Sequence, residues 1–338
     1  MKAAVSRGTQ KIVIEDVPTP EPGPNQVLVK VRYSAICGSD VHRFQYGAMT
    51  PGSIMGHEYI GEVVQTGAEV TLVKTGDRVV GGGGEPPAGV PGPVSAGARY
   101  SARTVGLGLM RFGGFAEYVV MDEWRPLPIP PGVSDELAVL AEPASVAMHA
   151  VRTSKFKIGD ATVVMGAGPI GLLTMQVLNA GGAEAVYVSE PAPARAEAAR
   201  VLGAALVMDP RDSDVVAKVV ELSGGLGVPV AFDAAAAKPT LQQGLEMVRR
   251  GGQVLLVSMA WEDVDLLTVE WIGREVELKA VYGAEPIDWR TGLNLMERGQ
   301  LSSQSMVTDQ SFIGFDEMQS SLERLMKPEE HVQLVLVP

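Results

Sequence analysis

Along the first 130 residues, apolar and polar positions alternate in short stretches that are separated by glycine, proline and other turn residues. Four segments follow this pattern: "QVLVKVRYSAI" (26–36), "GEVVQTG" (61–67), "DRVVGGGG" (77–84) and "GFAEYVVM" (114–121). A period of two predicts β-strands with one buried face, and the Gly/Pro-rich intervals predict turns. This part of the chain is therefore predicted to be mainly β, as in a distorted barrel.

The pattern changes in the segment 128–154, where Ser134 is a candidate helix N-cap and the apolar period becomes helical. From residue 161 onward, strand-like and helix-like segments alternate. The predicted strands are "ATVVMGAG", "AVYVSE", "ALVMD", "PVAFDAA", "QVLLVS" and "ELKAVYG", and the intervening helices include "PIGLLTMQVLNAGG" and "PARAEAARVLGA". Such alternation predicts an α/β fold with a doubly wound parallel sheet and helices on both faces.

The C-terminal part predicts two helices and one strand. The helices are "DWRTGLNLMERGQL" (288–301) and "FDEMQSSLERLM" (315–326), and the strand is "HVQLVLVP" (331–338). We expect this strand to return to the sheet of the N-terminal domain. The sequence therefore predicts a discontinuous, mainly β domain formed by residues 1–145 and 287–338, and an α/β domain over residues 146–286.

Length and composition support two domains and limit the partners. A chain of 338 residues is long for one hydrophobic core. Its net charge of -12 disfavours binding to nucleic acid or to an anionic membrane. We expect no membrane span and no signal peptide, because the sequence has no sufficiently long apolar run. A single cysteine excludes an internal disulfide and is typical of a reducing compartment, so a cytoplasmic location is expected.

A glycine-rich turn lies between the first strand and the first helix of the alternating region. Gly166, Gly168 and Gly171 have G-x-G-x-x-G spacing, and Pro169 and Ile170 lie between the last two glycines. The first glycine permits the tight turn, the second permits close approach of a pyrophosphate, and the third permits close packing of helix on strand. The helix N-terminus adds free N–H groups for phosphate binding. We therefore predict a dinucleotide site.

The next strand ends at Glu190, 24 residues beyond Gly166, near the position where an acidic residue binds the adenosine ribose hydroxyls. A carboxylate at this position repels a 2′-phosphate, so NAD(H) is favoured over NADP(H). Arg195 argues in the opposite direction, because its guanidinium could reach a phosphate.

The stretch "CGSDVHRFQYGAMTPGSIMGHE" (37–58) contains the single cysteine and two of the four histidines. Cys37, His57 and Glu58 offer the ligand types of a catalytic zinc, and Glu142 near the domain junction is a fourth candidate. A lone cysteine is commonly a small buried apolar residue, and a His-Glu pair is commonly part of a surface turn. Spacing alone leaves the metal and the structural interpretations open.

Seven motifs occur in an order that resembles the zinc-dependent medium-chain dehydrogenase/reductase family, in the branch of sorbitol, threonine and butanediol dehydrogenases. They are "CGSDVH", "GHEYIGEV", "GDRVV", "GGFAEYVV", "LAEPASVAMHAV", "GAGPIGLL" and "VRRGGQVLLVS". The resemblance implies a GroES-like catalytic domain (1–145 and 287–338) and a Rossmann domain (146–286). It also implies an NAD(H)-linked enzyme that interconverts a secondary alcohol, polyol or hydroxy compound and its ketone by hydride transfer.

The resemblance implies a catalytic zinc at Cys37, His57 and a glutamate, with Glu58, Glu142 or both as the carboxylate ligand. It further implies that Ser39 contacts the substrate oxygen and that His42 continues a proton relay through the cofactor ribose. Their alternatives are a turn-capping serine and a solvated histidine. His149 and His331 are expected to be structural.

One feature departs from the family pattern. Many members hold a second, structural zinc with four cysteines after "GDRV", but here that interval is the Gly/Pro-rich loop 81–98 without cysteine. We therefore expect one catalytic zinc per chain and no structural zinc. Members of the family are usually oligomers, so we expect a homodimer or homotetramer, with the strands between residues 253 and 283 as the candidate interface.

Two alternatives remain. A zinc-free quinone or enoyl reductase of the same superfamily would lack the metal ligands, all of which are present. A non-catalytic nucleotide-binding protein would be free to lose Cys37, Ser39 or the glycine triplet, and all of them are retained. The individual alcohol substrate is not predicted.

Overall fold

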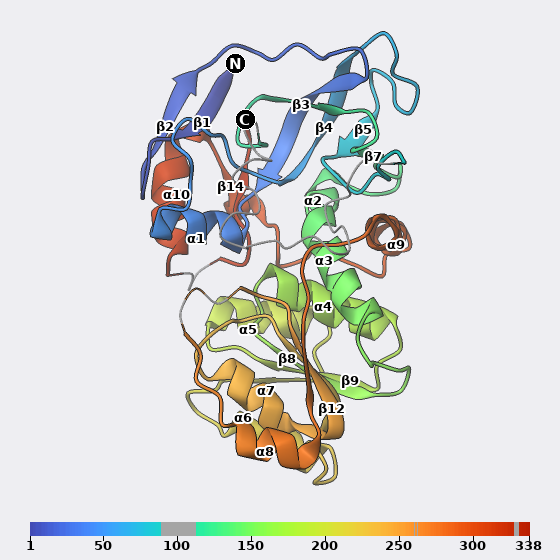
Figure 1. Cartoon of the computed structure of the whole chain (residues 1–338), viewed down its shortest axis with the longest axis vertical. Coiled ribbons are helices and arrows are strands. Elements are labelled where there is room, and N and C mark those ends of the chain that lie inside the picture. The colour runs from blue at the N-terminus through green and yellow to red at the C-terminus, as the bar shows by residue number, and fades with distance from the viewer. Residues whose placement is uncertain (89–112, 260, 262, 328–330) are drawn as a thin grey trace.

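The computed structural model describes residues 1–88, 113–259, 261, 263–327 and 331–338. Two large β-sheets organise the molecule (Figure 1). The upper half combines the N-terminal strands with the C-terminal end of the chain, and the lower half contains the strands between residues 161 and 280.

The six-stranded sheet of the lower half is parallel throughout. Its strands are β8 (Ala161–Met165), β9 (Ala185–Ser189), β10 (Leu206–Met208), β11 (Val228–Asp233), β12 (Val248–Leu256) and β13 (Glu277–Ala280). They lie in the order β10-β9-β8-β11-β12-β13, and every pairing of neighbours is parallel. The strand order reverses between β8 and β11, and such a switch point is where doubly wound sheets bind nucleotides.

Helices cover both faces of this sheet, as the sequence predicts. They are α4 (Pro169–Ala180), α5 (Pro193–Val201), α6 (Val215–Leu222), α7 (Thr240–Met247) and α8 (Thr268–Arg274). On β8, Val164 belongs to the same apolar cluster as Leu172 of α4, whereas Val163 belongs to the cluster of Leu245 of α7. The strand is therefore buried on both faces, which explains its mainly apolar sequence, with Thr162 as its one polar residue.

The sheet of the upper half contains strands from both ends of the chain. Its strands are β3 (Gln26–Ala35), β4 (Glu58–Thr66), β5 (Arg78–Val80), β6 (Tyr118–Asp122), β7 (Leu127–Pro128), β14 (Phe312–Ile313) and β15 (Val335–Leu336). β15 pairs antiparallel with β3, so the C-terminal strand does return to the N-terminal sheet. β1 (Lys2–Ser6) and β2 (Ile12–Asp16) form a separate hairpin-like pair. The predicted combination of a Rossmann sheet and a discontinuous, mainly β part is confirmed.

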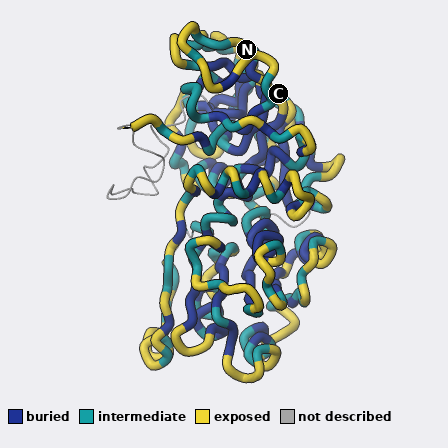
Figure 2. Tube along the Cα trace, turned by 90° about the vertical axis from the view of Figure 1, so that its right-hand side faces the viewer, coloured by how far each residue is buried: buried dark blue, intermediate teal, exposed yellow. Residues whose placement is uncertain are grey.

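The helices outside the Rossmann sheet are α1 (Gly38–Tyr46), α2 (Asp135–Ala138), α3 (Ala141–Arg152), α9 (Pro286–Glu297) and α10 (Met318–Leu325). Ser134 caps α2, where its side chain accepts a hydrogen bond from Leu137 N. One apolar cluster contains Ile60 of β4, Ala144 of α3 and Leu172 of α4, so α3 joins the cores of the two halves. Figure 2 shows buried residues running through the interior of both halves.

The predicted domain boundaries at 145/146 and 286/287 stay a prediction, and the first of them falls within α3. Of the predicted loop 81–98, only residues 81–88 belong to the described part. Among the helices that the structure describes, none combines the length and hydropathy needed to cross a membrane.

Candidate functional site

Three candidate metal ligands meet where two strands of the upper sheet end. One possible ligand atom from each of Cys37, His57 and Glu58 lies within 4.8 Å of the others. The register of β3 and β4 pairs Ala35 with Glu58, and Cys37 follows Ala35 by two residues. Strand pairing thus brings together a thiol, an imidazole and a carboxylate that are about 20 residues apart in the sequence. These residues are brought together as the sequence predicts.

Asp40 is a further residue of this site that was not identified from the sequence. It lies in the first turn of α1 and is fully buried, and its Oδ2 accepts a hydrogen bond from Cys37 N at 3.2 Å. Its Oδ1 lies 3.6 Å from His57 Nδ1, and neither of these buried atoms has a hydrogen-bond partner among the residues that the structure describes. A carboxylate beside one ring nitrogen orients an imidazole so that the other nitrogen can bind a metal. The sequence feature that could have identified Asp40 is its position three residues after Cys37, where an acidic residue can bind the backbone of the helix cap.

Burial and negative charge dominate the electrostatics of the group. Burial, together with the Glu58 carboxylate, raises the pKa of Cys37 to about 11. Burial and the charge of Glu142 raise the pKa of Glu58 as well. Burial alone would lower the pKa of His57, but Asp40 and Cys37 outweigh it and hold that pKa well above its ordinary value. The buried Asp40 and Glu58 and the partly buried Cys37 and Glu142 lie near the His57 imidazole, an arrangement of acidic groups that a divalent cation would stabilise.

Glu142, the fourth candidate ligand, lies in the first turn of α3. It is outside the group of atoms that lie within 4.8 Å of one another, although its charge acts on Glu58. Burial is the main cause that raises its own pKa. The donor set fits zinc with Cys37, His57 and Glu58 as ligands, and Glu142 is near enough to complement it electrostatically.

Helix α1 carries the two predicted proton-transfer residues. Cys37 caps this helix, and its Sγ accepts a hydrogen bond from Ser39 N at 3.4 Å. His42 follows about one turn later, and burial lowers its pKa. Its ring lies 5.8 Å from the ring of Trp261, which stacks on Tyr46 at 5.4 Å. Within the described part of the chain, the buried atoms His42 Nδ1 and Trp261 Nε1 have no hydrogen-bond partner. No local sequence pattern indicates this contact of Trp261.

The glycine-rich turn has the geometry that its sequence predicts. Gly166 has φ +90°, and a Cβ atom there would lie 3.0 Å from Ala235, which follows β11. A Cβ atom on Gly171 would lie 1.9 Å from Gly166 O, so only glycine permits this approach of helix to strand. Gly168 is the N-cap of α4 and faces open space apart from Arg195, and Pro169 and Ile170 are the first two residues of the helix.

Glu190 directly follows β9 and is buried beside this turn. Its carboxylate accepts hydrogen bonds from Ala167 N at 2.6 Å and from Ala192 N at 2.7 Å. Arg195 of α5 extends to the same turn, where its Nη1 would lie 3.8 Å from a Cβ atom on Gly168. Its Nε donates to His331 O at 3.3 Å. The two residues therefore lie at the turn and beside each other, with the acidic group tied to the backbone.

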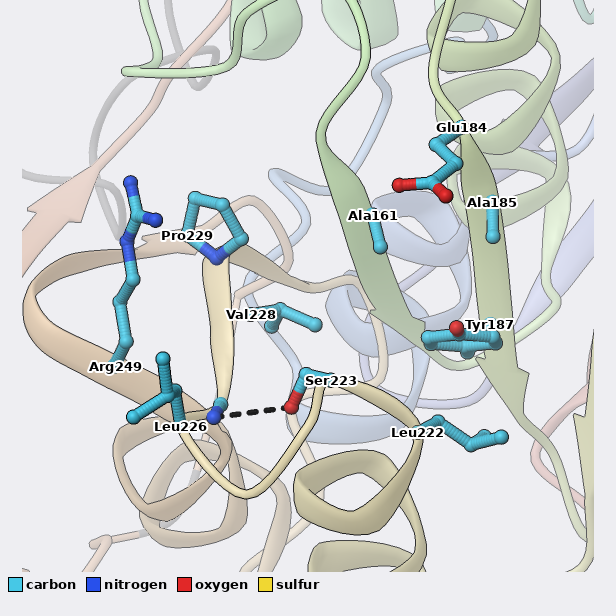
Figure 3. Close-up of a pocket in the computed structure, with 11 residues that line it drawn as sticks. Ala161, Glu184, Ala185, Tyr187, Leu222, Ser223, Leu226, Val228, Pro229 and Arg249 are labelled. Atoms are coloured by element: carbon cyan, nitrogen blue, oxygen red, sulfur yellow. Dashed lines mark hydrogen bonds between the residues drawn. The ribbon is translucent and has the colours of Figure 1, made fainter.

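A cavity of about 300 Å³ lies at the amino ends of the strands of the six-stranded sheet, away from the glycine-rich turn (Figure 3). Ala161, Ala185 and Val228, the first residues of β8, β9 and β11, line it. Ser223 Oγ in its wall accepts a hydrogen bond from Gly227 N at 3.0 Å. The glycine-rich turn follows the carboxyl end of β8, whereas this cavity lies at the amino end of that strand, so the two are separate.

His149, Glu285 and Asp288 form a second cluster of possible ligand atoms. Arg152 occupies it: its Nε donates to Asp288 Oδ1 and its Nη2 to Glu285 Oε2, each at 2.6 Å. His149 Nδ1 lies 2.8 Å from Asp288 Oδ2. The cluster is an ion-paired contact between α3 and α9, which agrees with the expected structural role of His149.

Comparisons with known proteins give the following matches. The family model of the alcohol dehydrogenase GroES-like domain matches residues 23–131, and that of the zinc-binding dehydrogenase matches residues 169–298. The chain is 35% identical to (R,R)-butanediol dehydrogenase of Bacillus subtilis (strain 168) over 353 aligned positions, which cover 100% of both chains. It is 31% identical to sorbitol dehydrogenase of Halalkalibacterium halodurans, over 91% of this chain and 92% of that protein.

Among solved structures, a zinc-binding dehydrogenase from Sinorhizobium meliloti 1021 bound to NADP is similar at a TM-score of 0.86. The two chains are 27% identical, and the match covers 100% of this chain and 99% of the other.

Proposed function

Since the chain belongs to the zinc-dependent medium-chain dehydrogenase/reductase family and is an alcohol-dehydrogenase-type oxidoreductase, we propose that it interconverts a secondary alcohol and its ketone with NAD(H). The substrate class is a polyol or another hydroxy compound, as the names of its butanediol and sorbitol dehydrogenase relatives suggest. The observation that carries this proposal is the approach of Cys37, His57 and Glu58 to within 4.8 Å.

Cys37, His57 and Glu58 would hold one zinc ion per chain, with Glu142 as a nearby carboxylate available when the coordination changes. When bound, zinc supplies Lewis acidity to a substrate hydroxyl, and the nicotinamide supplies the hydride acceptor. Asp40 fixes the orientation of His57 through the ring nitrogen that faces it. A shielded, buried setting favours this chemistry because charges interact more strongly there than in water.

Ser39 and His42 would move the proton that leaves the substrate hydroxyl. Ser39 belongs to the same helical turn that Cys37 caps, so its hydroxyl is carried on the backbone that presents the thiol. His42 lies farther along α1, and burial holds its pKa below the ordinary value, which favours the neutral, proton-accepting imidazole. The two side chains offer a route from the metal site toward the cofactor ribose.

The cofactor would bind along the turn that contains Gly166, Gly168, Pro169, Ile170 and Gly171. The free N–H groups at the start of α4 and the Arg195 guanidinium suit a pyrophosphate. Glu190 would favour NAD(H), because its carboxylate, buried beside the turn, repels a 2′-phosphate. This preference is a property of the single residue and is testable by binding alone.

Cys37→Ala tests the proposed mechanism directly. Wild-type protein with NAD⁺ should oxidise at least one member of a panel of secondary alcohols, polyols and hydroxy acids. The variant should lose turnover by about 10³-fold or more, because a catalytic metal ligand is removed, while NADH binding measured by fluorescence changes little. Thr162→Ala, a buried substitution on β8, is the control and should retain both. Turnover retained in Cys37→Ala would contradict the metal mechanism.

A further inference from the structure

Gln333 is a buried polar residue in an apolar run near the C-terminus. Its side chain is 2% exposed, and its neighbours Val332, Leu334 and Val335 are all buried. Its Nε2 donates to Ile36 O at 3.0 Å and lies 3.4 Å from Leu334 O. The same nitrogen lies 3.5 Å from Glu58 Oε2. The amide therefore touches the residue that precedes Cys37 and the carboxylate of Glu58.

The backbone around Gln333 is fixed where the two ligand-bearing strands meet. Val335 pairs with Ala35 of β3, and Ile36 N donates to Leu334 O at 2.9 Å. Ala35 is also the partner of Glu58 on β4. The C-terminal segment thus lies beside both strand ends, and the side chain of Gln333 reaches across them. Little backbone freedom remains to change the direction of its amide.

The side-chain amide of Gln333 is unexpected at a buried position among apolar residues. Burying an amide costs free energy unless its N–H and C=O groups find partners, whereas leucine or methionine would fill similar space without that cost. An amide nitrogen has two N–H groups. One is matched by Ile36 O, and the other is shared between Leu334 O and Glu58 Oε2. A lysine or arginine would neutralise the carboxylate, whereas a neutral donor can orient it and leave its charge in place.

We propose that Gln333 is a positioning residue of the metal site: its buried amide holds the Glu58 carboxylate in a fixed orientation relative to Cys37 and His57. The proposal rests on the proposed zinc site. Groups that hydrogen-bond to metal ligands tune metal affinity, and their removal typically costs about 10- to 100-fold. Gln333 acts on the metal through Glu58 and needs no contact with the substrate.

Zinc affinity and the spectrum of the cobalt-substituted protein test this role. In Gln333→Leu, zinc affinity measured by chelator competition should fall by about 10- to 100-fold. The visible absorption bands of bound Co²⁺ should also shift, because they report the geometry of the ligands. Gln176→Leu is the matched control: Gln176 is 4% exposed and binds the backbone of Ser302 through both ends of its amide. This variant should leave affinity and spectrum unchanged.

Gln333→Asn keeps an amide but shortens its reach, and it provides the same two readouts if the leucine variant does not fold. An affinity within twofold of wild type and an unshifted cobalt spectrum in the variant that folds would overturn the role of Gln333, while the zinc site itself would stand. A wild-type chain that binds neither Zn²⁺ nor Co²⁺ would instead overturn the proposed function, and this inference with it.

Discussion

At the scale of single residues, two buried carboxylates of the candidate site also hold the backbone around them. Asp40 and Glu190 are both buried and both accept backbone hydrogen bonds, one from Cys37 N and the other from Ala167 N and Ala192 N. Each therefore shapes a loop in addition to any role toward a metal or a nucleotide. Removing such a side chain entirely would disturb the loop, so replacing its charge alone is the cleaner experiment.

Glu190→Gln should reduce the preference for NADH over NADPH by about 10-fold or more. The amide keeps an acceptor oxygen for one of the two backbone N–H groups, loses the acceptor for the other, and removes the charge that repels a 2′-phosphate. Titration of each cofactor by fluorescence measures the ratio of dissociation constants without any alcohol substrate. The control is Glu184→Gln, because Glu184 lies before the amino end of β9, away from the glycine-rich turn. This variant should leave the ratio unchanged. The same ratio in Glu190→Gln would remove Glu190 from cofactor selection.

At the scale of elements, α3 and α9 are joined by the ion pairs of Asp288 with His149 and Arg152. Burial by itself raises the pKa of Asp288, but hydrogen bonds from His149 and Arg152 outweigh it and hold that pKa well below its ordinary value. A carboxyl with a depressed folded-state pKa stabilises the protein above its unfolded pKa of about 3.9. This contribution is lost as the pH falls below about 4.

Asp288→Asn should therefore lower the free energy of unfolding at pH 7 by about 1 to 2 kcal/mol, because it removes charged hydrogen bonds to Asp288, while Arg152, which is 36% exposed, keeps its pair with Glu285. The difference from wild type should shrink progressively as the pH falls below about 4, because the carboxyl then becomes protonated in the unfolded chain while it is still ionised in the folded one. Urea unfolding at several pH values measures both effects. Asp209→Asn, which breaks the exposed pair with Arg211, should change stability little. A loss in Asp288→Asn that is independent of pH would contradict the ionic explanation.

The elements also show what sequence reasoning can and cannot find. The strands of the Rossmann sheet and the helices α4 and α5 were predicted, because strand-like and helix-like apolar patterns alternate in this part of the chain. Helix α1 was not predicted, because it is short and its start depends on a cap from Cys37 and Asp40. The return of the C-terminal strand was predicted, but the contact of Gln333 with Glu58 depends on register between residues 275 positions apart.

The residues of the candidate site also divide into those that the sequence identifies and those that only the structure identifies. Cys37, His57 and Glu58 were identified because their residue types are rare in this chain or typical of metal ligands. Asp40 was visible beside them but was not singled out. The stacking of Trp261 on Tyr46 joins a loop of the lower sheet to α1 of the upper half, and no local pattern encodes such a contact.

At the scale of the whole molecule, the last strand of the six-stranded sheet provides a candidate contact between copies. β13 ends the order of this sheet, and none of the residues of α8, which precedes β13 in the chain and packs against α7 and β12, is buried. Leu267, Val269 and Ile272 are 59%, 65% and 74% exposed. Exposed apolar side chains next to a sheet edge favour association with a second copy of the chain. We propose a homodimer or homotetramer built through this region.

Val269→Lys combined with Ile272→Lys should convert the oligomer to smaller species, because two charges would be buried in the contact. Light scattering coupled to size-exclusion chromatography gives the mass of each form. Ile158→Lys, which changes an equally exposed apolar residue that lies before β8, is the control and should keep the wild-type mass. A monomeric wild type, or a double variant of unchanged mass, would contradict this interface.

The measurement that tests the central claim most directly is the zinc content of freshly purified protein, obtained by elemental analysis. We expect about one zinc per chain in the wild type and in Thr162→Ala, and nearly none in Cys37→Ala, because Cys37 is one of the three ligands of the proposed site. A wild-type value near zero that added zinc does not restore would contradict the account, and would favour a metal-free reductase or a non-catalytic nucleotide-binding protein.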